Sequence, residues 1–203
     1  MNLREKKAMQ KKEAIMKAAI SVFAEKTYQG ATLEDVAQRL LMTKGAVYYY
    51  FKDKQDLLYQ SQVYLLENSL NNIAEIEESD LPAEEKVSQA ISQHIEYVIH
   101  ERTGFESMLS SESILSNEQY EHILRLQNGY EKHFDELIQE GITQGVFIQA
   151  DIKIVRNLIL GAMNWLMHWY SEGGKKSKHE LSKMIAFYLM RMVLKTPNDQ
   201  VES

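Results

Sequence analysis

Residues 43–51 read TKGAVYYYF, with three consecutive tyrosines that begin at Tyr48. Because an α-helix turns by about 100° per residue, three neighbouring side chains would spread over roughly 200° of its surface. They cannot all be buried. Val47 and Phe51 are four residues apart on one face, so we expect these two to point inward. Tyr48 and Tyr49 then project from the exposed flank.

Short helices are predicted on both sides of a tight turn before this stretch. Thr32 stands three residues before Asp35, as in a capping box, and Thr43 is a second N-cap candidate. An amphipathic helix over about residues 9–26 precedes them. This order fits a helix-turn-helix, whose second helix enters the major groove. Three small helices within an all-α bundle would give the same pattern, and the pattern alone leaves both open.

The polar residues of this region suit contacts with DNA. Lys44 and Gly45 lie at a helix start, where a cation can reach a phosphate and a residue without Cβ lets the backbone approach closely. Phenol hydroxyls can donate to phosphate oxygens while their rings cover sugar or thymine methyl groups. Thr32 and Lys54 stand at two further helix starts, where the helix dipole favours phosphate.

One ordered series of residues runs through this region: Gly30-Ala31-Thr32, Val36-Ala37, Thr43-Lys44-Gly45, Val47-Tyr48-Tyr49-Tyr50-Phe51 and Lys54. The series resembles the DNA-binding domain of TetR-type bacterial repressors over roughly residues 10–58. In that family the run is close to S/T-K-G-x-L/I-Y-x-H-F-x-x-K-x-x-L. Tyr50 stands where histidine is more usual, a departure that leaves the neighbouring contacts intact.

The resemblance implies a set of DNA-binding residues. They are Thr32, Thr43, Lys44, Gly45, Tyr48, Tyr49 and Lys54, with Thr32 and Lys54 as phosphate anchors. The basic residues before them could reach a neighbouring groove, but we expect most of this arm to be a frayed, solvated end. These residues are Arg4, Lys6, Lys7, Lys11 and Lys12.

Composition indicates an all-α fold. The 203 residues are 44% apolar and 26% charged, with only two prolines and nine glycines. Cysteine is absent, which excludes disulfides and thiolate metal sites. The start of the chain has no apolar signal region, and the most apolar run, residues 158–170, is too short to span a bilayer. We therefore expect a soluble, cytoplasmic protein.

Charge is divided unevenly along the chain. Residues 1–60 hold 11 Lys and Arg against 7 Asp and Glu, a balance of +4. The remaining residues hold 12 against 22, a balance of −10, so that the sum is the overall −6. A basic head on an acidic body suggests that the head binds a polyanion.

Helical periodicity predicts about nine helices and two domains. Residues 1–54 would form the DNA-binding domain and residues 55–203 a helical ligand-binding and dimerisation domain. Beyond the helix that follows Asp53, helices are expected over about 83–100, 105–115, 118–144, 152–170 and 179–194.

Dimerisation is expected because one short recognition helix makes too few base contacts to be specific, so that a two-fold dimer would read a palindrome. The last two helices are apolar on nearly every side, so each must be covered by other helices on both of its sides. The candidate interface residues are Leu158, Leu166, Trp169, Ile185, Tyr188, Leu189 and Met192. The alternative is that both helices are internal to one subunit.

A ligand pocket in the middle helices is what the TetR resemblance implies, and only composition suggests its lining. The candidates are Phe105, Met108, Leu109, Tyr130, Phe134, Trp165 and His168. Methionine and aromatic side chains suit a small apolar or lipid-like effector, although ordinary core packing explains each of them as well.

No cofactor or metal site is expected. The six histidines, at positions 94, 100, 122, 133, 168 and 179, show no HExxH spacing and no close pairing with acids at one clear site. The chain also lacks a P-loop, a dinucleotide fingerprint and a nucleophile motif, which argues against an enzyme.

The sequence therefore predicts a dimeric, ligand-responsive transcriptional repressor that binds double-stranded operator DNA. The alternative is a DNA-binding activator or partner-regulated regulator without a small-molecule effector.

Overall fold

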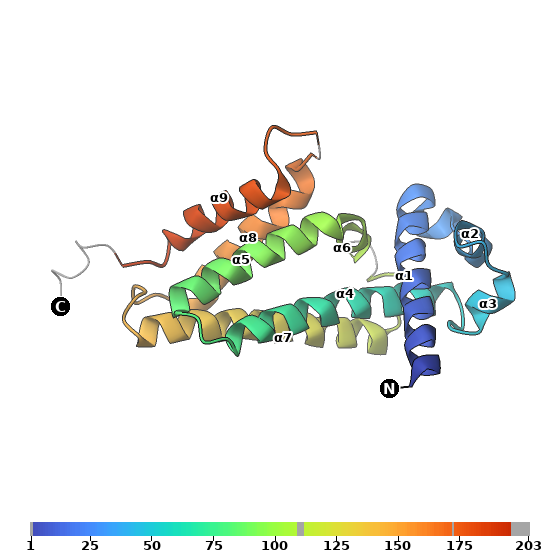
Figure 1. Cartoon of the computed structure of the whole chain (residues 1–203), viewed down its shortest axis with the longest axis horizontal. Helices are drawn as coiled ribbons and strands as arrows, with labels where there is room; N and C mark the ends of the chain where they lie inside the picture. Colours follow the sequence, from blue (N-terminus) through green and yellow to red (C-terminus); the bar gives the residue numbers. More distant parts are fainter. Residues whose placement is uncertain (1, 109–111, 172, 196–203) are drawn as a thin grey trace. The chain divides into compact units, whose positions relative to one another are not determined.

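The chain is built from α-helices, as a computed structural model that describes residues 2–108, 112–171 and 173–195 shows (Figure 1). The helices are α1 Leu3–Gly30, α2 Leu33–Arg39, α3 Lys44–Tyr48, α4 Lys54–Glu77, α5 Ala83–His100, α6 Arg102–Met108, α7 Asn117–Thr143, α8 Ile152–Trp169 and α9 Lys178–Met190. Within these ranges the only β-type pairing is an isolated bridge between Phe147 and Leu194. The all-α prediction is confirmed.

The helices form two compact units. The first unit holds Met1–Leu66 together with Thr103–Leu124, and the second holds Glu67–Arg102 together with Arg125–Ser203. Both α4 and α7 are continuous helices that contribute one part to each unit.

Local hydrogen bonds fix the short helices of the first unit. The Thr32 hydroxyl accepts from the Asp35 N–H at 3.2 Å, and the Asp35 carboxylate accepts from the Thr32 N–H at 2.9 Å, which completes the expected capping box. The Thr43 hydroxyl accepts from the Ala46 N–H at 3.3 Å and so starts α3. Between α2 and α3, Leu41 takes a left-handed conformation with φ 53°, which reverses the chain. The predicted helix-turn-helix is present.

The first helix begins earlier than the sequence suggested. Asn2 and Glu5 form a capping box, and α1 starts at Leu3. The basic arm is therefore helical, and the prediction that it is a frayed end is wrong, because an N-cap and its partner three residues later were overlooked. Near its other end α1 is kinked at Thr27, which has φ 60°.

The core of the second unit lies where α5 packs against α8 and α9 (Figure 1). On α5, Val87, Ile91 and Ile95 recur at four-residue intervals, and all three are fully buried. Phe134 from α7 and Ile159 from α8 join them in one cluster. This spacing puts a continuous apolar stripe on the inner face of each helix.

The last helix is shorter than predicted. α9 ends at Met190 rather than near Leu194, because the following backbone leaves the helix to pair with the loop after α7. Ile148 N–H donates to the Val193 carbonyl at 2.8 Å, and Lys195 N–H donates to the Val146 carbonyl at 3.1 Å. None of the described helices has the length and apolar character needed to cross a membrane.

The loop after α7 makes one very close contact. A Cβ on Gly141 would lie 2.1 Å from a ring carbon of Phe147, whose side chain is fully buried. We expect Gly141→Ala to lower the free energy of unfolding by about 1–3 kcal/mol, because the ring has no space into which it can move. Urea denaturation followed by circular dichroism measures this.

Gly129→Ala on the same helix is the control. Its new Cβ would meet only the end of the Leu70 side chain, at 3.4 Å. We expect a change within about 1 kcal/mol, because the higher helix propensity of alanine offsets a small displacement. Equal losses in the two variants would contradict the packing of Phe147 on Gly141.

Candidate functional site

The side chains of α3 and of the three residues after it divide between the core and the surface. Val47 and Phe51 are completely buried, as predicted. Tyr48 and Tyr49 are 47% and 79% exposed. Tyr49 also meets Tyr50 edge to face, with ring centroids 5.0 Å apart. Two hydroxyl-bearing rings therefore stand on the outer surface of a helix that is anchored from beneath.

Lys44 extends this surface at the start of α3. Its ammonium pairs with the Glu34 carboxylate on α2 and lies 5.5 Å from the ring centroid of Tyr48. The hydrogen bond from Lys44 lowers the pKa of Glu34 and raises the pKa of Lys44. Both side chains are about half exposed, and ion pairs at such sites are weak. A phosphate group can therefore replace Glu34 as the partner of Lys44.

The backbone at the start of α3 is open to approach. Nothing lies within 4 Å of the position that a Cβ on Gly45 would occupy. Since the first N–H groups of a helix are without intrahelical acceptors, they are suited to an anion. The Thr43 hydroxyl keeps its proton for an outside acceptor, whereas the Thr32 hydroxyl donates to Asp35 at 2.9 Å. Thr43 is thus better placed for a phosphate than Thr32.

Lys54 serves the scaffold of this site. Its ammonium donates to the carbonyls of Tyr28 at 2.7 Å, Ala31 at 2.9 Å and Gln29 at 3.4 Å. It also lies 4.4 Å from the Tyr28 ring centroid. An ammonium group has three donors, and these three carbonyls at the end of α1 occupy them. In this structure Lys54 therefore closes the end of α1 instead of presenting its charge to a phosphate.

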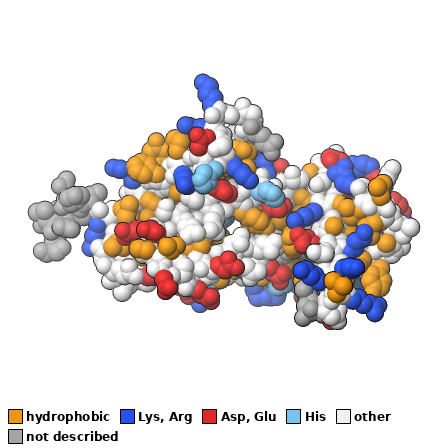
Figure 2. Space-filling view, viewed as in Figure 1, with side chains coloured by type: hydrophobic (Ala, Val, Ile, Leu, Met, Phe, Trp, Pro, Cys, Tyr) orange, Lys and Arg blue, Asp and Glu red, His pale blue; other side chains and the backbone are white. Residues whose placement is uncertain are grey.

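Lys and Arg side chains gather over the part of the first unit that holds α1, α2 and α3 (Figure 2). The exposed lysines of α1 include Lys6, Lys7 and Lys11, and Lys12 lies 5.9 Å from the Phe51 ring centroid. This arrangement gives the surface around α3 a positive potential that favours a polyanion.

The predicted ligand-binding residues are not gathered in one place. Phe105 belongs to the first unit, and Leu109 and the side chain of Met108 lie outside the described residues. Tyr130 and Phe134 are neighbours in the second unit, with ring centroids 5.5 Å apart.

Trp165 and His168 stand on the surface of α8, with ring centroids 4.4 Å apart. Their predicted place in an interior pocket is therefore corrected to an exposed one. Only Tyr130 and Phe134 of the predicted set share an interior site.

A partly buried polar network beside Tyr130 was not anticipated. His94 Nδ1 lies 2.7 Å from the Tyr130 hydroxyl, and His94 Nε2 lies 3.1 Å from Asn164 Oδ1. Burial lowers the pKa of His94 to about 4, although the bond to Asn164 opposes this, and burial raises the pKa of Tyr130. His94 is therefore neutral at pH 7: its Nε2–H donates to Asn164, and Tyr130 donates to Nδ1.

The hollow beside this network is small. It is lined by His94, Tyr130 and Tyr97 together with Ile73 and Ile76, and its volume is about 10 Å³. A space of this size holds no more than about one water molecule. This hollow could not be predicted from the sequence, because its residues come close together only through the packing of separate helices.

The predicted dimer residues divide into a group that is buried or half-buried in its own chain and a group that is exposed. Leu166 is 1% exposed and Leu189 8%, and both belong to the core of their own chain. Side chains this buried have no surface left for a second copy, so their assignment to the interface is corrected. Ile185 and Met192 are half-buried against the same core.

The outer face of α8 carries an apolar stripe. Ile154, Leu158, Trp165 and Trp169 recur at helical spacing, and each is more than half exposed. Gly161 lies on the same face with open space around it. We call these five residues the α8 stripe. On α9, Phe187 and Tyr188 are exposed as well, and hydrophobic side chains are visible over α9 in Figure 2.

Two family models match this chain. "Bacterial regulatory proteins, tetR family" covers residues 15–60, and "Tetracyclin repressor-like, C-terminal domain" covers residues 80–193. Together with the exposed α3 and its capped scaffold, these matches define a helix-turn-helix transcriptional regulator that binds DNA. The chain belongs to the TetR family.

Known proteins resemble the chain over most of its length. The Bacillus subtilis "Fatty acid metabolism regulator protein" is 27% identical over 165 residues, which cover 76% of this chain and 82% of that protein. The TetR family regulator PfmR from Thermus thermophilus has the same fold, with a TM-score of 0.79 and 24% identity over 87% of this chain and 97% of its own.

A further structure of the same fold is AibR in complex with isovaleryl coenzyme A and operator DNA. Its TM-score is 0.74 at 18% identity, and the match covers 90% of this chain and 97% of that one.

Proposed function

We propose that this protein is a dimeric repressor that acts in the bacterial cytoplasm, where it binds a palindromic operator. The observation that carries the proposal is the division of side chains in and just after α3, where Val47 and Phe51 are buried while Tyr48 and Tyr49 are exposed beside Lys44. Residues 1–54 serve DNA binding, and residues 55–203 serve ligand binding and dimerisation.

The DNA contacts follow from the surface of α3. Lys44 leaves Glu34 for a phosphate, and Thr43 donates its hydroxyl proton to a neighbouring phosphate. Gly45 lets the backbone come close to the duplex. Tyr48 and Tyr49 reach phosphate oxygens and base edges. Thr32 supports these contacts by capping α2, and Lys54 does so by closing the end of α1. Both touch phosphate less directly than the sequence suggested.

A second copy of the chain covers the α8 stripe. Apolar side chains that are more than half exposed and recur on one helix face are stable only when they are covered. Two such helices cross closely at Gly161, and Tyr188 on α9 joins the interface. A dimer of this kind presents two α3 helices to half-sites about 34–36 Å apart.

The effector is an acyl compound, on the strength of two similar proteins. One is named as a fatty acid metabolism regulator, and the other was crystallised with isovaleryl coenzyme A. The small hollow beside His94 and Tyr130 means that an acyl chain enters only when α4, α5 and α7 of the second unit separate. Such opening is a population shift toward a second conformation.

The alternative is a regulator without a small-molecule effector. The volume of about 10 Å³ at the polar network favours it, because this conformation has no room for an acyl chain there. The two forms of the proposal differ in whether a ligand changes operator affinity.

We expect the double variant Lys44→Ala, Tyr48→Ala to bind DNA more weakly, because it lacks a phosphate contact and an aromatic contact. The loss of binding free energy is about 1–3 kcal/mol, which corresponds to a rise in Kd of about 5–150-fold. Fluorescence anisotropy at fixed salt measures it, with a duplex that the wild-type protein selects from a random library. Lys153→Ala, an exposed lysine of α8, is the control. Unchanged affinity of the double variant would falsify the proposed DNA surface.

We expect Trp165→Glu to convert the dimer into a monomer, because it places a charge in the middle of the α8 stripe. Sedimentation velocity at about 10 µM distinguishes the two states. Gln139→Glu adds the same charge on the exposed face of α7 and should leave the dimer intact. A dimeric Trp165→Glu variant, or a monomeric wild type, contradicts the proposed interface.

We expect an acyl coenzyme A to weaken operator binding by about 5–150-fold, which corresponds to a coupling of about 1–3 kcal/mol. Isovaleryl and palmitoyl coenzyme A are compared with free coenzyme A in the anisotropy assay, and calorimetry shows whether each has bound. Affinity that stays constant while the acyl compound is bound, or no binding at all, favours the regulator without an effector.

A further inference from the structure

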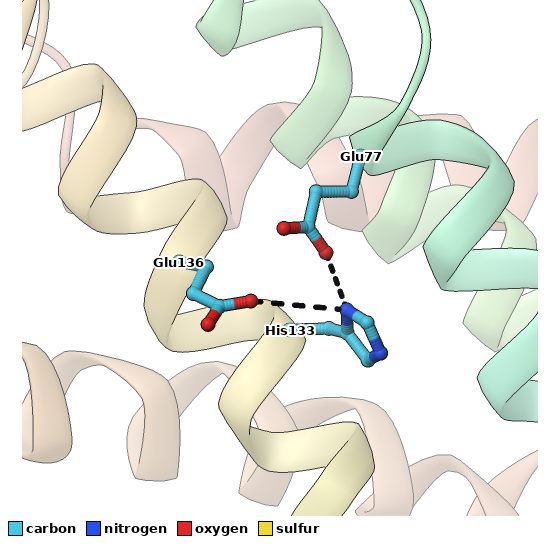
Figure 3. Close-up of side chains that lie close together, drawn as sticks. All are labelled: Glu77, His133 and Glu136. Atoms are coloured by element: carbon cyan, nitrogen blue, oxygen red, sulfur yellow. Dashed lines mark hydrogen bonds and ion pairs between the residues drawn. The ribbon is translucent and has the colours of Figure 1, made fainter.

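Three side chains of the second unit converge on one point (Figure 3). His133 Nδ1 donates a hydrogen bond to a Glu77 carboxylate oxygen, and it lies 4.0 Å from a Glu136 carboxylate oxygen. One donor atom from each of the three residues lies within 4.8 Å of the others. The sequence pointed to no one clear site that pairs histidine with acids, and this cluster corrects that expectation.

The helices bring these residues together from distant positions. His133 and Glu136 are three residues apart on α7, so that both side chains leave the same face one turn apart. Glu77 is the last residue of α4. The carbonyl end of a helix carries partial negative charge, which adds to the field of the two carboxylates.

Within the cluster, the histidine can hydrogen-bond to only one of the two carboxylates through Nδ1. Nδ1 carries at most one proton, which serves one carboxylate. Glu136, at 4.0 Å, is beyond hydrogen-bond distance of Nδ1. A divalent cation between the three residues would instead accept a lone pair from the imidazole and from both carboxylates.

The surroundings are acidic. Residues 131–140 of α7 read EKHFDELIQE, with four carboxylates against one lysine. Two of the four, Glu131 and Asp135, are engaged by Arg156 at 3.1 Å and 2.6 Å. Lys86 is engaged by a third, Glu140, at 3.1 Å.

Lys132 is the cation nearest in sequence to the cluster. It contacts Glu136 at 3.1 Å, but its side chain is 76% exposed and can turn into solvent. Glu77 and Glu136 therefore remain available to a metal ion.

We infer that Glu77, His133 and Glu136 form a binding site for a divalent first-row transition metal ion, of which Zn²⁺ is the best match. One imidazole nitrogen and two carboxylate oxygens suit this class of ion, whereas Mg²⁺ and Ca²⁺ prefer oxygen ligands alone. The inference goes beyond operator and acyl binding, and it does not depend on either.

Little movement is needed to form the coordination sphere. Metal–ligand bonds of about 2.0–2.2 Å in a tetrahedron place the ligand atoms roughly 3.4 Å apart. All three side chains are partly exposed and can rotate by the required distance of about 1 Å. The fourth position is left for water. The bound ion ties the end of α4 to α7 within the second unit and makes that packing stronger.

Isothermal titration of the full-length protein with Zn²⁺, without a polyhistidine tag, tests the inference. We expect one Zn²⁺ per chain in the wild type. Glu77→Gln and Glu136→Gln keep the shape of the side chain and should each weaken binding by at least about tenfold, and His133→Ala should do the same. Co²⁺ is a second probe, because a nitrogen and oxygen ligand set gives it a visible absorption spectrum that the variants should lose.

His179→Ala is the matched control. His179 Nδ1 lies 2.8 Å from Glu96, an ion pair of the same kind that forms no three-residue cluster within the described part of the chain. This variant should bind Zn²⁺ as the wild type does. Lys132→Ala removes the competing cation and should bind at least as tightly. Wild type that binds no Zn²⁺, or Glu77→Gln and Glu136→Gln variants that bind it as well as the wild type does, overturns the inference.

Discussion

The burial of two side chains below a five-residue helix is the constraint on which the DNA-binding surface depends. An isolated helix as short as α3 is unstable in water, because fixing the backbone of the first turn costs more free energy than its few hydrogen bonds contribute. α3 persists because Val47 and Phe51 are fully buried and Thr43 caps its first turn. The same anchoring determines the direction of Tyr48 and Tyr49, since neighbouring positions on a helix are about 100° apart. The core thereby orients side chains that do not belong to it.

Features that depend on a few neighbouring residues could be predicted from the sequence. The N-caps at Thr32 and Thr43 are side-chain bonds to the backbone N–H three residues away, and both are present. The bounds of α5 agree with the periodicity of its buried residues. The TetR resemblance rests on a contiguous run, and the family is shown by matches to both parts of the chain.

Features that depend on which helices meet could not be predicted. α8 is apolar on both sides, so its sequence alone does not tell which side faces the core. Leu166 was therefore grouped with exposed Trp169, although one is buried and the other is half exposed. Likewise, His133 and Glu136 are close in sequence, but Glu77 lies 56 residues from His133 and meets it only because α4 and α7 pack together. Contacts of this kind are a property of the tertiary structure.

The bonds of Lys54 determine where the DNA-binding part of this chain can be separated from the rest. The first residue of α4 holds the last carbonyls of α1, so the final turn of the first helix is completed by a residue that comes after the recognition helix. A fragment cut just before Lys54 would leave those carbonyls with water as their only partner, and it would lose the ring contact with Tyr28. A transplantable DNA-reading module must therefore carry the opening of α4 with it. A fusion that joins a different C-terminal domain to this DNA-binding domain must therefore place the junction inside α4, so that the helix continues across it.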